Sequence, residues 1–435
     1  MLRRNFILAT ATTFLASAKA LATRKVVADS SADFEIIATP YLCGGGTDCV
    51  FVVFPVNKLS LADVYVWSDD DADFKEPVLF VESELTGRKH VGTIHNIKID
   101  GLKNGKTYFY KIVAKEVIKY WNYRKSPKDK YGETVLGKTI TLEKNVDGTP
   151  LKFTLPKTES KTLTFAMVND LHENVGKINK LFKAFPNDNY DFLVVNGDTV
   201  NYMMEEERLF KRSVGVIAEN LKGVKPVYYL RGNHETRGQT AEDYFKYFPT
   251  PTGKTYFAFK AGPAFFLFLD LCEDKPDSSK EGEYLNNYSK YRNEEVKWLR
   301  EIVKLPEFKS AKYRIAIQHI PSVGEYLAYR SETDLHLSDV LKDANIDMAL
   351  CGHLHRHCIF PKGSDARELY RTTEKLKAQL MRAVNAEDGK VHYPTVVNSH
   401  KEAMFVHISE ENIKLEFFDM AGKKSQPDFV YTASM

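Results

Sequence analysis

After its first twenty residues this chain has no apolar run long enough to cross a lipid bilayer, no internal repeat and no low-complexity tract. Its composition is also without strong bias, at 43% hydrophobic, 12% aromatic and 27% charged residues. These values are typical of a globular protein and exclude the disordered, fibrous and membrane-bundle classes. Because 435 residues exceed what one hydrophobic core supports, we expect two domains, or one domain with a large insertion.

The chain has little net charge once its first segment is set aside. Residues 1–20 begin with Arg3 and Arg4, continue through an uncharged run and end in small residues around Lys19, the layout of a signal peptide cut after Ala20. Its removal brings the 61 basic side chains level with the 58 acidic ones, so charge indicates no nucleic-acid or membrane partner.

The first segment predicts export rather than anchoring. The arginine pair followed by Phe6 suggests the twin-arginine route, which carries folded proteins. No cysteine follows the apolar run, so a lipid anchor is not indicated, and no later apolar run is long enough for a transmembrane anchor. We expect a periplasmic or secreted protein, and the alternative is that this run is a buried first helix.

Cysteine is scarce, and its spacing excludes a zinc–thiolate site. Cys43 and Cys49 bracket a glycine-rich turn and could close a small disulfide loop in an oxidising compartment. The other three, Cys272, Cys351 and Cys358, lie near strand ends and fit small buried hydrophobic residues.

Two different patterns of apolar residues divide the rest of the chain. Residues 30–156 contain short β-branched and aromatic runs between polar turns, which predict a β-sandwich. From 161 to 425, strand-length apolar runs alternate with amphipathic stretches such as 205–221 and 293–304, which predict a mostly parallel sheet covered by helices. Residues 120–131 read as an exposed loop, and 363–390 as a lid or surface insertion.

Polar side chains follow five of the later apolar runs directly. Because the carboxyl ends of parallel strands share one edge, we expect these side chains to converge. They are Asp170, His172, Asp198, Asn233, His234, His319, His353 and His355. Such oxygen and nitrogen donors suit divalent Mn, Fe, Co or Zn, and they are too many for one tetrahedral ion, so two metal ions are the simpler interpretation.

In this order the motifs DLH, GD, GNHE, a lone strand-end histidine and GHLH resemble the signature of calcineurin-like metallophosphoesterases. The resemblance implies that Asp170, His172 and His355 bind the first metal and that Asp198 bridges to the second. It implies that Asn233, His319 and His353 complete the second site. His234 would protonate the leaving oxygen or stabilise its charge, with Asp170 the candidate to orient its imidazole.

The segment Gly101–Ile112 resembles a strand-entry motif of fibronectin type III-like domains through Leu102, Tyr108 and Tyr110. The sandwich as a whole resembles the amino-terminal domain of purple acid phosphatases. The expected fold is therefore an N-terminal β-sandwich followed by an α/β domain of the α/β/β/α metallophosphoesterase type. Purple acid phosphatases place a tyrosinate ligand where this chain has Asn201. We therefore predict a colourless enzyme that does not require ferric iron.

Several other residues are weaker candidates for the site. Arg231 and Arg237 flank GNHE and either contact phosphate or form ion pairs. His357 is left out because the donor set is already complete. Candidates to wall the cleft are Tyr202, Tyr284, Tyr288 and Tyr326, and structural roles are expected for His90, His95, His336, His392, His400 and His407.

The expected activity is in-line attack of a metal-bridging hydroxide on a small phosphate ester. A phosphomonoester is preferred because the sandwich-plus-core layout resembles monoester phosphatases. The alternative is a phosphodiesterase acting on nucleotides or glycerophosphodiesters. A surface-binding protein without turnover is less favoured because no ligand position is lost, and the sequence indicates no oligomeric state.

Overall fold

The computed structural model describes residues 33–82, 87–120, 134–322, 337–366 and 390–433. The predicted signal peptide and Tyr326 lie outside these residues, as do most of the segments 120–131 and 363–390. Within the described part of the chain, no helix is both long and apolar enough to span a bilayer.

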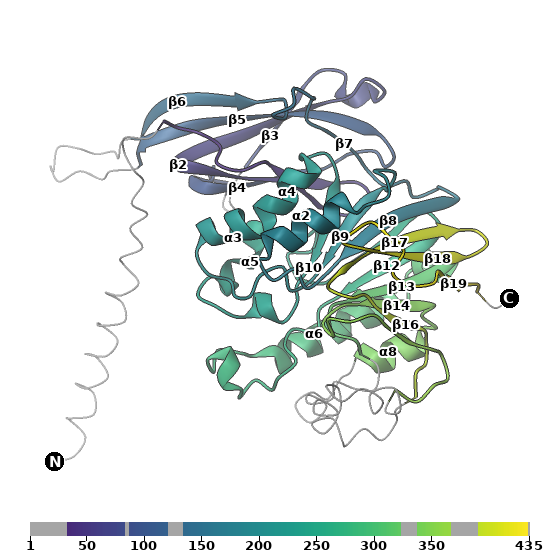
Figure 1. The fold of residues 1–435 in the computed structure, drawn as a ribbon. Helices are drawn as coiled ribbons and strands as arrows, with labels where there is room; N and C mark the ends of the chain where they lie inside the picture. Colours follow the sequence, from purple (N-terminus) through teal and green to yellow (C-terminus); the bar gives the residue numbers. More distant parts are fainter. Residues whose placement is uncertain (1–32, 83–86, 121–133, 323–336, 367–389, 434–435) are drawn as a thin grey trace, which may run out of the picture.

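The N-terminal strands form two layers around one long strand, β2 (Val50–Trp67). The first half of β2 pairs with β1 (Tyr41–Gly44) and β4 (Gly92–Ile99), and its second half with β3 (Val78–Val81) and β5 (Thr107–Lys119). Its pairing shifts register between Pro55 and Ser60, where it passes from one layer to the other. The second layer continues through β6 (Val135–Leu142) and β7 (Lys152–Thr154), and a short helix η1 (Ala72–Phe74) follows β2. The expected sandwich is therefore present, at the top of Figure 1.

The first sheet of the α/β part is built on three parallel strands, β8 (Thr162–Val168), β9 (Phe192–Asn196) and β10 (Pro226–Leu230). Antiparallel strands β17 (Glu402–Ser409), β18 (Ile413–Asp419) and β19 (Phe429–Tyr431) extend it beyond β8. Its outer face packs on α2 (Val175–Lys183), α3 (Glu206–Arg212), α4 (Val214–Leu221) and α5 (Tyr244–Tyr247). Short helices η2 (His234–Thr236) and η3 (Ala241–Asp243) lie between β10 and α5.

The second sheet has the order β11 (Phe257–Ala261), β12 (Ala264–Leu269), β13 (Tyr313–Gln318), β14 (Met348–Cys351), β16 (Thr395–Val397) and β15 (Cys358–Phe360). The strands β12, β13, β14 and β16 are mutually parallel. Helices α6 (Tyr288–Ile302), α7 (Pro306–Ser310) and α8 (Leu337–Asp343) lie against its outer face, and η4 (Lys280–Gly282) precedes α6.

The two sheets of the α/β part pack face to face through an aromatic core. Phe165 stacks on Phe192 at a centroid distance of 5.0 Å, and Phe266 meets Phe165 edge-on at 5.6 Å. Strands buried on both faces need near-continuous apolar runs, and the sequences of β9 and β12 provide them. The α/β/β/α arrangement expected from the sequence is confirmed (Figure 1).

The two parts of the chain are joined more closely than their sequence patterns predict. β1 pairs in parallel with β10 through Leu42 and Cys43, so the sandwich and the first sheet of the α/β part form one continuous sheet. The hydroxyl of Tyr110 donates to the carbonyl of Gly223 at the end of α4, 2.8 Å away. Sequence periodicity cannot predict such pairing because a strand pattern does not identify its partner.

Two local expectations are wrong. The amphipathic stretch 205–221 is not one helix: Ser213 leaves helical geometry with φ −137° and ψ −102°, and separates α3 from α4. The disulfide suggested for Cys43 and Cys49 is absent, because both are free thiols held apart. Cys43 faces the carbonyl of Tyr247, and the thiol of Cys49 donates to the carbonyl of Gly45 at 3.0 Å.

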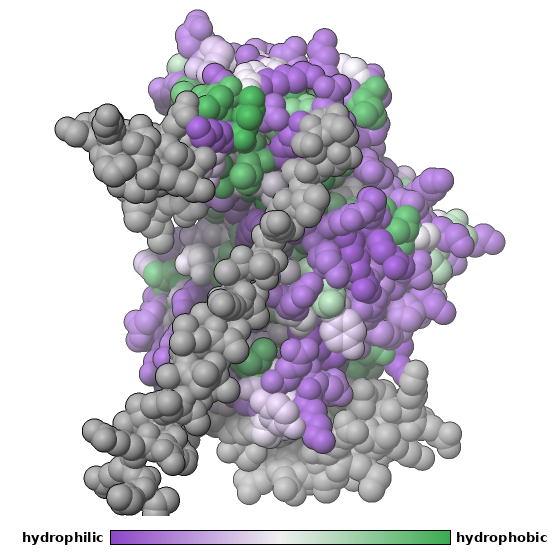
Figure 2. All heavy atoms as spheres, turned by 90° about the vertical axis from the view of Figure 1, so that its left-hand side faces the viewer, coloured by the Kyte–Doolittle hydropathy of each residue, from purple (hydrophilic) through white to green (hydrophobic). Residues whose placement is uncertain are grey.

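The surface is largely hydrophilic on the face shown in Figure 2, with an apolar group over the sandwich at the top. Exposed apolar side chains of this part include Leu59, Ile118 and Leu136. They lie at the end of the β2–β5–β6 layer, away from the strand ends that carry the polar constellation.

Candidate metal centre

The predicted polar side chains converge, but from two sheets rather than from one sheet edge. β8, β9 and β10 of the first sheet lead into the residues around Asp170, Asp198 and Asn233. β13 and β14 of the second sheet lead into His319 and His353. Because both sheets end in the same direction, their carboxyl edges jointly form the site.

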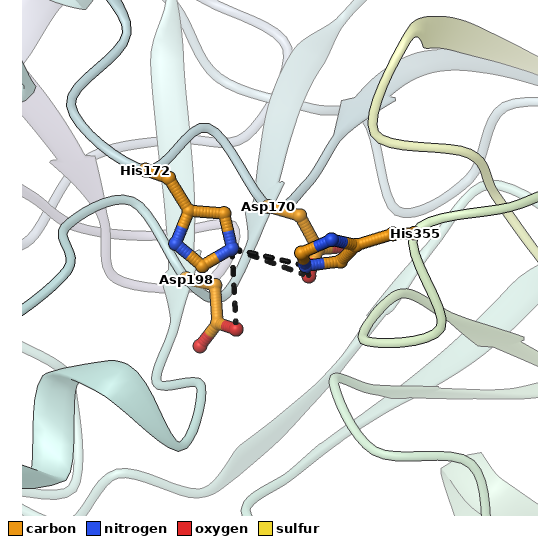
Figure 3. Close-up of side chains that lie close together, drawn as sticks. All are labelled: Asp170, His172, Asp198 and His355. Carbon is orange, nitrogen blue, oxygen red and sulfur yellow. Dashed lines mark hydrogen bonds and ion pairs between the residues drawn. The ribbon is translucent and has the colours of Figure 1, made fainter. Parts of the chain in front are cut away.

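The first group of donors consists of Asp170, His172, Asp198 and His355, whose ligand atoms all lie within 4.8 Å of one another. Nε2 of His355 is 3.0 Å from Nε2 of His172 and 3.1 Å from Oδ1 of Asp170. Figure 3 shows the two imidazoles pointing toward each other beside both carboxylates. Two ligands of one tetrahedral ion bound at roughly 2.0–2.1 Å are about 3.3 Å apart, so the spacing suits a shared cation.

The second group consists of Asp198, His319 and His353. Nε2 of His319 lies 3.1 Å from Oδ2 of Asp198, and Nδ1 of His353 lies 2.9 Å from the side-chain oxygen of Asn233. Asp198 belongs to both groups. Its carboxylate is therefore positioned to contact two cations.

The backbone at this site is held in an unusual conformation. Asp170, His172, Asp198, His353 and His355 all have φ between 49° and 68°, in the left-handed region. A non-glycine residue there is strained, and such strain persists only where the surrounding structure enforces it. The strand ends thus hold the donors in place independently of a ligand.

The electrostatics of the donors favour a cation. Burial would raise the pKa of Asp170, but His319 and His355 outweigh it and lower this pKa to about 2. Burial would lower the pKa of His319, but the carboxylates of Asp198 and Asp170 raise it to about 10. The two carboxylates thus favour positive charge at this position, which a divalent ion would supply.

Unpaired polar atoms give a second test of metal binding. Oδ1 of Asp170 and Nε2 of His319 are buried, and neither makes a hydrogen bond of acceptable geometry. A buried group without a partner costs about 1–3 kcal/mol, so such atoms call for one. The residues present therefore fit two divalent ions, one held by each group with Asp198 between them.

Two buried polar networks fix the bridging and terminal carboxylates. Glu235 accepts main-chain hydrogen bonds from Asp198 at 3.0 Å and from Gly232 at 2.8 Å, which ties the β9 and β10 loops together. Asn169 donates to Oδ2 of Asp170 at 2.6 Å and exchanges hydrogen bonds with Asn398. Neither Glu235 nor Asn398 was singled out by the sequence.

The imidazole of His234 lies beside the donors without joining them. Its Nε2 is 3.9 Å from Oδ2 of Asp198, and its ring meets that of His172 at a centroid distance of 4.7 Å. Its Nδ1 lies 2.8 Å from the carbonyl oxygen of Asn201. The orienting role expected of Asp170 therefore falls to this carbonyl, which fixes the proton on Nδ1 and turns Nε2 toward the site.

The flanking arginines are committed to carboxylates. Arg231 pairs with Asp270 at 2.7 Å, and Arg237 donates to both oxygens of Glu273 at 2.6 and 2.7 Å. Of the two roles considered for them, the ion-paired role is the one observed. The side chain of Asn201 donates to the carbonyl of His172 at 3.3 Å, so it points along the loop.

The remaining candidates are placed as follows. His357 packs on Phe417 at 4.6 Å and belongs to neither donor group, as expected. Tyr202 is exposed and lies 6.2 Å from the ring of His234, which supports a place in the cleft wall. Tyr288 stacks under Arg231, and Tyr284 is exposed.

Two further residues lie beside the donors: His400, for which only a structural role was expected, and Lys177, which was not a candidate. The ring of His400 lies 4.9 Å from that of the donor His355, and the ammonium of Lys177 donates to the carbonyl of Asp170. A signal for His400 was present: the apolar run of β16, parallel to β14, ends directly in Asn398 and His400. It was a sixth strand end of the same kind.

Comparison with known proteins agrees with this geometry. A profile of the calcineurin-like phosphoesterase family matches residues 163–357. The rat (Rattus norvegicus) serine/threonine-protein phosphatase CPPED1 is 26% identical over 199 residues, which cover 42% of this chain and 57% of that protein. The chain thus spans little more than half the length of this relative.

Among solved structures, purple acid phosphatase PPD1 from yellow lupin (Lupinus luteus) seeds has a similar fold. The TM-score is 0.57 at 13% identity, and the match covers 90% of this chain and 74% of that one. Because the match reaches across the sandwich, it supports the order of the two parts. The match, the motifs and the donor geometry together identify residues 163–357 as a calcineurin-like phosphoesterase domain.

Proposed function

We propose that this protein hydrolyses phosphate esters at a dinuclear metal centre and that phosphomonoesters are its preferred substrates. The observation that carries the proposal is Asp198, which is common to two groups of buried donors. Two divalent ions bound there would supply charge for the phosphate oxygens and lower the pKa of a water molecule to near neutrality. Mn, Fe, Zn and Co all suit the nitrogen and oxygen donors.

The protein's own residues would position and protonate the substrate. Asp170, His172 and His355 would hold one ion, and Asn233, His319 and His353 the other. His234 would act as the general acid through Nε2, because Nδ1 is held by the carbonyl of Asn201. Tyr202 would pack against the leaving group beside His234.

The preference for monoesters rests on the names of two similar proteins. Both the rat relative and the lupin structure bear the name phosphatase. The runner-up is a phosphodiesterase acting on nucleotides or glycerophosphodiesters, since the donor geometry suits the phosphoryl centre of either ester.

Parallel assays on 4-nitrophenyl phosphate and bis(4-nitrophenyl) phosphate test this proposal. The enzyme should be loaded with manganese or zinc, and kcat/KM compared at equal metal content. We expect the monoester to be favoured and a chelator to abolish both reactions. A large preference for the diester would assign the protein to the runner-up activity, and no turnover with either would remove the enzymatic proposal.

Export of the protein is a further part of the proposal. It is supported by the signal-like composition of residues 1–20. Fractionation of the source cells, with the amino terminus of the exported form sequenced, tests it. A mature chain that begins at Leu21 is the expected result.

A further inference from the structure

A cavity of about 640 Å³ opens beside the metal centre on the side of His355. It shares the donors His353 and His355 with the centre, and His400 forms part of its wall next to His355. A molecule whose phosphate lies at the donors therefore reaches this cavity without crossing protein. It is a candidate subsite for the remainder of the substrate.

The cavity is rich in positive charge. Arg356 and Lys401 line it, and neither forms an ion pair with any acid in the described part of the chain. Lys401 directly follows His400 in the chain, and both residues line the cavity next to His355. These cations face space that a substrate can enter.

The acidic residue in the lining does not cancel this charge. The carboxylate of Glu402 accepts a hydrogen bond from Gln426 at 3.1 Å and lies 3.6 Å from the imidazole of His357. Its side chain is nearly buried and is committed to these neighbours. With two cations, Arg356 and Lys401, and one carboxylate, the lining keeps a net positive charge.

A second cavity near the site has the opposite character. It encloses about 500 Å³ around Arg231 and Arg237, which flank the turn that carries His234. Both arginines are already paired with Asp270 and Glu273, and Glu242, Glu281 and Glu283 also line it. The arginines of this second cavity are therefore already neutralised by carboxylates, and it is a poorer place for an anionic group.

We propose that the cavity beside His355 binds a second anionic group of the substrate, held by Arg356 and Lys401. The preferred substrates are then small organic phosphates that carry another phosphate or a carboxylate a few bonds from the hydrolysed ester. The inference rests on the proposed hydrolase function and adds its substrate class. Charge-assisted contacts of this kind strengthen binding by roughly tenfold or more.

Matched substrates with one hydrolysable ester test the proposal. Glycerol 3-phosphate and 3-phosphoglycerate differ only in whether a hydroxymethyl group or a carboxylate ends the molecule. With the metal-loaded full-length enzyme, we expect kcat/KM to favour 3-phosphoglycerate by about tenfold. The ratio should shrink as salt is raised, because salt screens exposed charges.

Substitution of Arg356 and Lys401 tests whether this cavity causes the preference for the carboxylate. In Arg356→Gln with Lys401→Gln the ratio of the two kcat/KM values should fall toward one. Arg300→Gln is the matched control, since Arg300 lines another basic cavity remote from the metal centre, and it should keep the ratio. A ratio near one in the unmodified enzyme, or a ratio that survives the double substitution, would overturn the inference.

Two further outcomes keep this inference separate from the hydrolase proposal. If no ester is hydrolysed, the hydrolase proposal fails, and calorimetric binding of the same two compounds still decides whether the cavity selects the carboxylate. If an acidic phosphoserine peptide gains more from Arg356 and Lys401 than 3-phosphoglycerate does, the small-molecule assignment is wrong.

Discussion

Replacement of Glu235 by glutamine perturbs the site without touching a metal donor. The carboxylate is 1% exposed, and four main-chain N–H groups donate to it. One oxygen accepts from Thr199 and Val200, and the other from Asp198 and Gly232. This single side chain thus fixes the loop of the bridging aspartate against the loop that carries His234.

The expected cost follows from the hydrogen bonds that glutamine cannot accept. Its amide oxygen can keep two of the four N–H groups, and its NH2 group then faces the other two. Each buried N–H left without an acceptor costs about 1–3 kcal/mol. Burial and the nearby Asp198 raise the pKa of Glu235, so the neutral amide regains part of this loss. We expect a net destabilisation of about 2–4 kcal/mol.

Denaturant titration and elemental analysis measure the two consequences. Glu235→Gln should unfold at a lower denaturant concentration and bind metal more weakly, because Asp198 loses its main-chain support. Glu242→Gln, at an exposed position of η3, is the control and should change neither quantity. If Glu235→Gln keeps the midpoint and two tightly bound metals, the bracing role assigned to this carboxylate is refuted.

Four further results are expected. His234→Ala should lower kcat by ~100-fold or more with metal content unchanged, and a loss within about threefold would contradict its role as general acid. Asp198→Ala should lose at least one of two metals by elemental analysis, and retention of both would exclude a bridging role. Iron-loaded protein should show no tyrosinate charge-transfer band in its visible spectrum, because Asn201 stands at the position of the phenolate. Burial raises the pKa of Glu416, but two lysines outweigh it and lower this pKa to about 2. Glu416→Gln should therefore destabilise the fold at neutral pH. In acid titrations of unfolding, the stability difference between the two proteins should fade as pH drops from about 4.5 toward 2.

Hydrophobic periodicity predicted most strands and helices of the fold. It did not predict where a helix breaks or which distant strands pair. Buried strands such as Phe192–Asn196 need continuous apolar runs, so their positions follow from the sequence. The break at Ser213 leaves the helical pattern on both sides intact, because α3 and α4 each bury apolar residues. The pairing of β1 with β10 is a long-range contact that neither strand specifies alone.

The donors were predictable because chemistry restricts them to residue types that follow strands. Their supports were harder to identify. The carbonyl of Asn201 that holds His234 carries no side-chain signature, since any residue at that position offers the same oxygen. Glu235 is part of the GNHE motif, yet only its four main-chain contacts show why a carboxylate is needed there.

The strain at the donors links metal binding to folding. Five donor residues occupy the left-handed region, and each such residue costs on the order of 1–3 kcal/mol. The close packing of the sheets behind them, whose strands are almost wholly buried, offsets this strain energy. The buried carboxylates of Asp170 and Asp198 lie close together, and they raise the pKa of His319 to about 10. Cations that bound this arrangement and not the unfolded chain would stabilise the fold in step with their affinity.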